Sequence, residues 1–247
     1  MPENWPATYN NPPIVEAIID LKWASPLSWP DCETTLLDGL AEHYPVRQRL
    51  DLMQVSATVR PGGVAVDASA VPWRWMLRSS DQRTAVGLGP EGVSIHVMKP
   101  YPGWGVLRAL AQQVHQRLQE LVGDLRLPVE VGLRYIDQIA LKPEGGANLA
   151  DYFPLIGRRP PSTGAELAAI HHLMHTVDPT TGLQSILTIA TLGRSVDARP
   201  VLLYDLQLRQ PLADEGLDWL TLLDVMHARQ RRIFEESISA HTRELFA

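Results

Sequence analysis

Alternating apolar and polar residues predict two long strands, one near the start of the chain and one near its middle. In residues 14–23 one parity is apolar throughout: Val15, Ala17, Ile19, Leu21 and Trp23. In residues 129–141 the same pattern is carried by Val131, Leu133, Tyr135, Ile139 and Leu141. A period of two with many β-branched residues is typical of a strand that buries one face.

Three segments place apolar residues at helical spacing instead. The first spans 32–44, with Ser28 and Asp31 as candidate N-caps. The longest amphipathic helix is predicted over 104–121, because Gly123 and Pro128 follow it as stop signals. A third is predicted over 217–234, and a single helical turn over 149–155.

The segments between these elements have the pattern of short antiparallel strands joined by turns. A hairpin is predicted around the turn at 60–63, and further strands cover 73–78, 84–88, 92–98, 166–177, 183–192 and 201–210. Both parts of the chain therefore follow the order strand, helix, antiparallel strands, long helix. The pattern predicts an α+β fold, in which antiparallel sheets are covered by long amphipathic helices.

A few residues also recur between the two parts. Val15-Glu16 returns as Val129-Glu130, 114 positions later, and Trp104 and Leu107 return as Trp219 and Leu222 at an offset of 115. Two segments at nearly one offset suggest a duplication, although tryptophan and leucine at helical spacing also recur by chance. We expect two halves, 1–125 and 126–247, packed as one unit.

Composition narrows the class of protein. The chain has 247 residues, of which 45% are hydrophobic and 20% charged, so it can bury a core. Its net charge of −6 disfavours nucleic acid as the main partner. One cysteine excludes an internal disulfide framework. Because no long apolar run or signal peptide is seen, we expect a cytoplasmic protein without a membrane partner.

Two motifs have an ordinary interpretation that we favour. Gly87–Gly92 matches G-x-G-x-x-G, but an alternating segment follows it where a dinucleotide site needs a helix. A hairpin turn is therefore predicted. His171, His172 and His175 would share a metal ion only on a helix, since on a strand the outer two lie about 13 Å apart. We expect no metal site and no cofactor.

The candidate binding residues lie on the two long strands. Asp137 has the parity of the apolar face, where a carboxylate needs a partner or a raised pKa. We expect it to be either a hydrogen-bonded structural group or a polar group at the floor of a cleft, with Tyr135 beside it. Arg134 has the opposite parity. Glu16 is the fourth candidate, although solvation or pairing with Lys22 is its simpler interpretation.

A nucleic-acid site is the alternative for the last helix. Arg229, Arg231 and Arg232 form a basic patch there, which the tryptophans of segment 73–78 could complement. An ion pair between Arg231 and Glu235, four residues apart on a solvated face, is the simpler prediction.

Motifs of common enzyme classes are absent from the sequence. There is no nucleophile elbow, P-loop or H-E-x-x-H, and Ser94 and His96 share a strand face without an evident third member. These absences favour a non-catalytic protein without excluding an enzyme, because catalytic groups are assembled in space.

Three segments together carry a resemblance. They are Asn11–Asp20, Val131–Asp137, and Phe234–Ile238 followed by Arg243 and Phe246. The chain resembles a sporadically distributed family of uncharacterised bacterial proteins of about this length. That resemblance implies an accessory role in defence, immunity or specialised-metabolism gene clusters. It brings no catalytic residues, and the family often has asparagine at the position of Asp137.

These observations lead to two functional hypotheses. The first is a non-catalytic accessory protein that binds a peptide or protein partner, including a second copy of itself, because sheet edges can accept a partner strand. The alternative is an enzyme or small-molecule-binding protein with a cleft between the halves, using Arg134, Tyr135 and Asp137.

Overall fold

The computed structural model describes residues 8–60, 63–123, 125, 128–142, 149–156, 169–196, 199–212 and 218–247, without the side chains of 51–73. The strands are β1 (Ile14–Trp23), β2 (Val46–Arg60), β3 (Gly63–Arg78), β4 (Thr84–Gly89), β5 (Gly92–Met98), β6 (Pro128–Ala140), β7 (His171–Val177), β8 (Gln184–Arg194) and β9 (Pro200–Pro211). The helices are α1 (Trp29–Gly39), α2 (Trp104–Val122), α3 (Leu149–Tyr152), α4 (Trp219–Ser237) and α5 (Ala240–Arg243).

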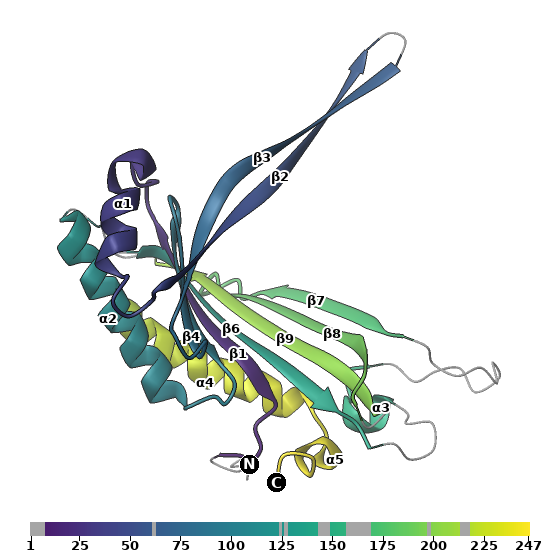
Figure 1. Ribbon diagram of the computed structural model, residues 1–247. Helices are drawn as coiled ribbons and strands as arrows, with labels where there is room; N and C mark the ends of the chain where they lie inside the picture. Colours follow the sequence, from purple (N-terminus) through teal and green to yellow (C-terminus); the bar gives the residue numbers. More distant parts are fainter. Residues whose placement is uncertain are drawn as a thin grey trace.

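The α+β class is confirmed, and a large antiparallel sheet dominates it (Figure 1). Among the described residues, nine strands form one sheet in the order β2-β3-β4-β5-β1-β6-β9-β8-β7. The expectation of separate sheets was wrong, because β1 pairs with β6 and makes the two groups of strands continuous.

The two long alternating strands lie side by side at the middle of this sheet. In the β1–β6 register Ala17 lies opposite Tyr135, and Ile19 lies opposite Leu133. Cross-strand partners point to the same face, so the apolar parities of both strands coincide there. Ile19 and Leu133 are fully buried.

Helices α2 and α4 cover the apolar face of the sheet, as Figure 1 shows. Helix α2 contacts β1 and β5, whereas α4 contacts β6 and β9. Each helix spans 19 residues and buries one stripe, as an amphipathic helix does on a sheet. Leu107 and Leu223 are fully buried members of these stripes.

Several predicted boundaries needed correction. Helix α1 begins at Trp29, not residue 32, because Pro30 in its first turn is compatible with a helix start. Residues 73–78 belong to the long strand β3 and form no strand of their own. Strand β7 begins at His171, and residues 166–168 lie outside the described part.

The glycines of Gly87–Gly92 belong to the β4–β5 hairpin, which confirms the turn. Gly89 lies opposite Gly92, and no helix follows. A Cβ on Gly92 would overlap the carbonyl oxygen of Leu21, and one on Gly87 would overlap Oγ of Ser94. Close approach of neighbouring strands therefore accounts for two of these glycines.

Within the described ranges, none of the helices combines the length and the apolar character that crossing a membrane requires.

The buried centre of the sheet predicts a large stability effect. Replacing Leu133→Ala removes a fully buried side chain and should lower the free energy of unfolding by about 2–5 kcal/mol. Leu192→Ala is the matched control, since Leu192 is 50% exposed and its loss should change the value by about 0.5 kcal/mol or less. Urea denaturation measures both, and equal effects would contradict this account of the core.

Candidate functional site

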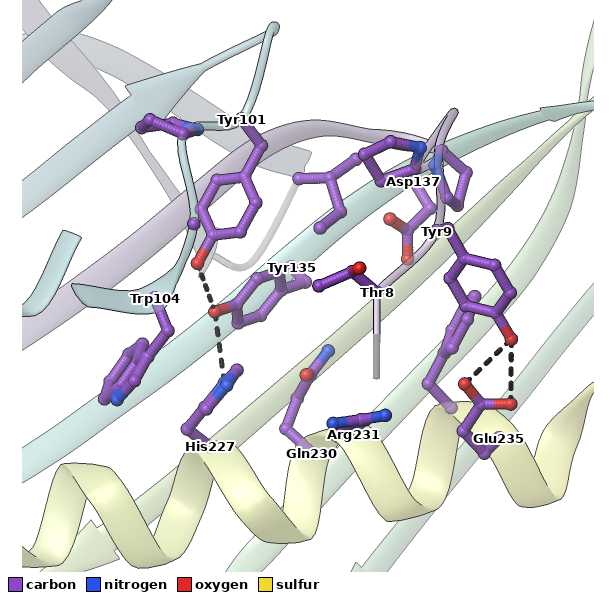
Figure 2. Close-up of a pocket in the computed structure, with 16 residues that line it drawn as sticks. Thr8, Tyr9, Tyr101, Trp104, Tyr135, Asp137, His227, Gln230, Arg231 and Glu235 are labelled. Carbon is purple, nitrogen blue, oxygen red and sulfur yellow. Dashed lines mark hydrogen bonds between the residues drawn. The ribbon is translucent and has the colours of Figure 1, made fainter. Parts of the chain in front are cut away.

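A cavity of about 490 Å³ lies where four segments meet on the helix-covered face of the sheet. They are the arm at residues 8–14, the β5–α2 connection, strand β6 and helix α4 (Figure 2). The lining residues are Thr8, Tyr9, Pro12, Pro13, Ile14, Tyr101, Pro102, Gly103, Trp104, Tyr135, Asp137, His227, Gln230, Arg231, Phe234 and Glu235. The cavity volume is in the range of small-molecule sites.

Strand geometry brings Tyr135 and Asp137 to this cavity. They are two positions apart on β6 and therefore share its apolar face. On the β9 side Asp137 lies opposite Tyr204, and on the β1 side the register shifts between Ile14 and Glu16. Ile14, at the irregular end of β1, lies opposite Asp137, and the arm before it lines the cavity.

Asp137 is the most unusual group of the site. It is 2% exposed, and within the described part of the chain its Oδ1 has no hydrogen-bond partner. Burial, with a smaller contribution from Asp205, raises its pKa to about 8. The prediction of a buried carboxyl is confirmed, and Asp137 also lines the cavity.

Aromatic residues form one wall of the cavity. The hydroxyls of Tyr101 and Tyr135 are 2.9 Å apart, and that of Tyr135 lies 3.3 Å from Nδ1 of His227. The His227 ring stacks on Trp104 with 4.4 Å between centroids. Burial, aided by nearby Arg231, lowers the pKa of His227 to about 4, so its imidazole is neutral at pH 7. Burial raises the pKa of Tyr101 to about 12.

Trp104 is fixed by the start of α2 and by α4. Its Nε1 donates to Oδ1 of Asp224 at 2.9 Å, and Arg108 donates to the same carboxylate. Gly103, the N-cap of α2, has a φ of 105°, a left-handed conformation that favours glycine. The wall is therefore pre-formed by two helices.

On the opposite side of the cavity, the carboxylate of Glu235 holds the arm through hydrogen bonds from two side chains. Tyr9 donates to Oε1 of Glu235 at 2.8 Å, and Arg243 donates to Oε2 at 2.9 Å. Burial and then the Glu235 hydrogen bond raise the pKa of Tyr9. The Asn11 amide also donates to the carbonyl of Phe246. These contacts hold the arm over the cavity.

The structure separates the four binding candidates of the sequence. Tyr135 and Asp137 line the cavity, but Arg134 and Glu16 lie on the other face of the sheet. Arg134 makes two hydrogen bonds to Asp205, of 2.8 and 2.6 Å. Lys22 pairs with Glu130 and not with Glu16, which corrects the simpler interpretation of Glu16.

Glu16 instead forms a hydrogen-bonded chain with His96 and Ser94, the pair for which the sequence showed no third residue. His96 Nδ1 lies 2.7 Å from Oε1 of Glu16, and His96 Nε2 lies 2.8 Å from Oγ of Ser94. The His96 hydrogen bond lowers the pKa of Glu16. Ser94 is fully buried, and its Oγ accepts from Arg74 at 3.0 Å. A substrate has no access to this hydroxyl, so the hydrogen-bonded chain is structural.

The basic residues of α4 do not form one patch. Arg231 lines the cavity, Arg229 lies beside the turn after β7, and Arg232 pairs with Glu236 at 2.8 Å. The predicted Arg231–Glu235 pair was wrong, because Glu235 turns inward to Arg243. Three arginines with different surroundings are a poor match to a phosphate backbone.

Two other candidate groups have structural surroundings. The three histidines lie on strand β7, as their alternation suggested, and the described residues contain no group of three His, Cys, Asp or Glu that could hold a metal ion. Trp75 donates to Glu33 of α1 at 2.6 Å, and the side chain of Trp73 lies outside the described part.

Comparison with known proteins adds little to this geometry. No protein-family model matches the chain, and no curated protein matches it. It is similar to the solved "di-domain ARO/CYC StfQ from the steffimycin biosynthetic pathway" with 13% identity, a TM-score of 0.22, and coverage of 94% of this chain and 96% of that chain. A TM-score this low supports no inference about fold or function.

The raised pKa of Asp137 predicts a pH-dependent stability. The folded state keeps a proton that the unfolded state, with an ordinary value of 3.8, has lost. The free energy of unfolding should therefore fall as the pH rises toward 8, by as much as ~1.4 kcal/mol per pH unit. Asp137→Asn should lack this fall, whereas Asp38→Asn, at an exposed carboxylate, should retain it. Parallel wild-type and Asp137→Asn curves in urea denaturation would refute it.

Proposed function

We propose that this protein binds a small molecule in the cavity between its two halves. The observation that carries the proposal is a buried carboxyl, Asp137, that lines a cavity and leaves Oδ1 without a partner among the described residues. Native proteins rarely leave a buried polar atom unpaired, and a bound ligand or water is a common explanation. The alternative hypothesis of the sequence is thus the one that the geometry favours.

We further propose that the two halves are pseudo-repeats. Strand β1 is followed across the sheet by β5, β4, β3 and β2, and strand β6 by β9, β8 and β7. In each series the first strand lies beside the last one, and a long helix follows in sequence. The shared order supports a duplication, and residues of both halves line the cavity.

The construction of the cavity suits binding without requiring catalysis. Its walls consist largely of aromatic rings and prolines, and its polar groups converge from β6 and α4. Rigid elements that hold a few polar groups in an apolar cavity are typical of ligand sites. Binding is therefore the minimal function of this arrangement.

A cavity-filling variant tests the proposal. Gln230 is 5% exposed and lines the cavity, so Gln230→Trp should occupy the space and weaken binding of the neutral probe acetylnaphthalene at least about tenfold. Val225→Trp on the same helix is the matched control, because Val225 is 62% exposed and outside the cavity. Ligand-detected NMR measures both. Equal affinities, or no binding to the unaltered protein, would refute the proposal.

A second candidate function is self-association through strand β7. This strand is an edge of the sheet, and its Leu173 and Val177 are 60% and 57% exposed. A second copy related by a two-fold axis would pair antiparallel with it and bring the same apolar side chains together. Of the partners expected from the sequence, a second copy is the one that this edge supports.

The edge predicts an oligomeric state. Leu173→Lys should convert a dimer into a monomer, because charge on an edge strand blocks strand addition. Leu192→Lys, at an exposed leucine of β8, should leave the dimer intact. Light scattering after size exclusion measures the mass. A wild-type protein that is monomeric at high micromolar concentration would exclude this candidate.

A further inference from the structure

The polar groups of the cavity define the chemistry of a ligand. Asp137 and Gln230 lie between the two walls, as Figure 2 shows, and Gln230 makes no hydrogen bond to the described residues. The hydroxyls of Tyr101 and Tyr135 already bond to each other. The groups that remain for a ligand are thus a carboxyl and a primary amide, both buried.

The charged groups near the cavity are mostly engaged elsewhere. Glu235 pairs with Arg243, and Asp205 pairs with Arg134 behind the sheet. Arg231 also lines the cavity, but no described cation makes an ion pair with Asp137. An anionic ligand would lie beside a carboxyl, and burial of an unpaired charge is costly. The middle of the cavity therefore suits a neutral molecule.

Asp137 itself is a hydrogen-bond donor at neutral pH. Its pKa of about 8 leaves the carboxyl protonated at pH 7, and a protonated carboxyl has one O–H. The Gln230 amide supplies two further donors. A ligand with an accepting oxygen can therefore take a hydrogen bond from the O–H of Asp137 or an N–H of Gln230.

We propose, resting on the proposed function, that the ligand is a neutral ring-bearing molecule with a carbonyl oxygen that accepts a hydrogen bond from Asp137. Tyr101, Trp104 and Phe234 supply flat apolar surface for the ring. The hydrogen bond from the Asp137 carboxyl then fixes the orientation of the ring in the cavity.

The titratable groups around Asp137 do not obscure the pH dependence that its own titration gives to binding. The groups that surround Asp137 are Tyr9, Tyr101, Tyr135, Tyr204, Asp205, His227, Arg231 and Glu235. The four tyrosine pKa values are raised and that of His227 is lowered, so these groups keep their protonation state near pH 8. The two carboxylates are held by arginines. Among the groups with a shifted pKa, Asp137 is thus the one that changes its charge near pH 8.

Three probes with one naphthalene body test the inference. They are acetylnaphthalene, isopropenylnaphthalene, in which C=CH₂ replaces C=O, and naphthylethylamine, which is a cation. The ketone should bind about tenfold more tightly than the hydrocarbon at pH 7, as one hydrogen bond allows. Its affinity should be constant below pH 8 and fall by about tenfold in total above it, as the donor O–H is lost, and then level off.

Two variants separate hydrogen bonding from structural damage. Asp137→Asn keeps an N–H donor, so it should bind the ketone within about threefold of the wild type and lose the pH dependence. Asp137→Ala should lose the preference for the ketone over the hydrocarbon. Because Asp137→Asn is nearly isosteric, it keeps the test valid if the alanine variant does not fold.

The outcomes distinguish this inference from the proposed function. Equal affinity for ketone and hydrocarbon would overturn the carbonyl assignment and leave small-molecule binding in place. An amine that binds best, more tightly as the pH rises and not to Asp137→Asn, would replace the carbonyl with an ammonium group. Failure of all three probes to bind would overturn both.

Discussion

The antiparallel pairing of β1 with β6 is the constraint on which the rest of the structure depends. It makes one sheet from two series of strands and aligns their apolar faces. Helices α2 and α4 then have a common surface to cover. The pairing becomes irregular at Ile14, and the cavity lies at that irregular end. The β1–β6 pairing thus aligns the residues of the core, and its irregular end borders the cavity.

The two faces of the sheet treat carboxyl groups in opposite ways. On the face away from α2 and α4, Glu16 accepts a hydrogen bond from His96, and Asp205 accepts two from Arg134. On the covered face Asp137 lacks such a partner among the described residues, so burial raises its pKa. A difference of one position along a strand decides between these environments. The cavity contains a carboxyl because Asp137 has the parity of the apolar face of β6.

Much of the fold was predictable, because alternation and helical spacing are local signals. The sequence located both central strands and both long helices, and it placed Asp137 on the apolar face. It could not show that β1 pairs with β6, because a pairing between strands more than 100 positions apart leaves no local pattern. The aromatic wall was missed for the same reason. Tyr101 and His227 belong to separate elements, and their approach to Tyr135 is a tertiary event.

Sequence reasoning also misjudged side chains whose partners are distant. Glu235 was assigned to Arg231 because four residues separate them on a helix, but the chain end brings Arg243 closer. Glu16 was expected to be solvated or paired with Lys22 of the same strand, but His96 faces it from β5. Proximity in sequence is a weak guide when a sheet offers partners on both sides.

The long hairpin of β2 and β3 has a mechanical consequence. Strand β3 pairs with β4 only from Trp75 onward, so about ten residues of each strand extend beyond the sheet as a two-stranded ribbon, as Figure 1 shows. At ~3.3 Å per residue the ribbon projects roughly 30 Å. Each of its strands is hydrogen-bonded along one edge only, so we expect the ribbon to be less stiff than the sheet. We therefore expect a load on the ribbon to act on the β2–β3 side of the sheet, away from β6 and β9, where α4 packs.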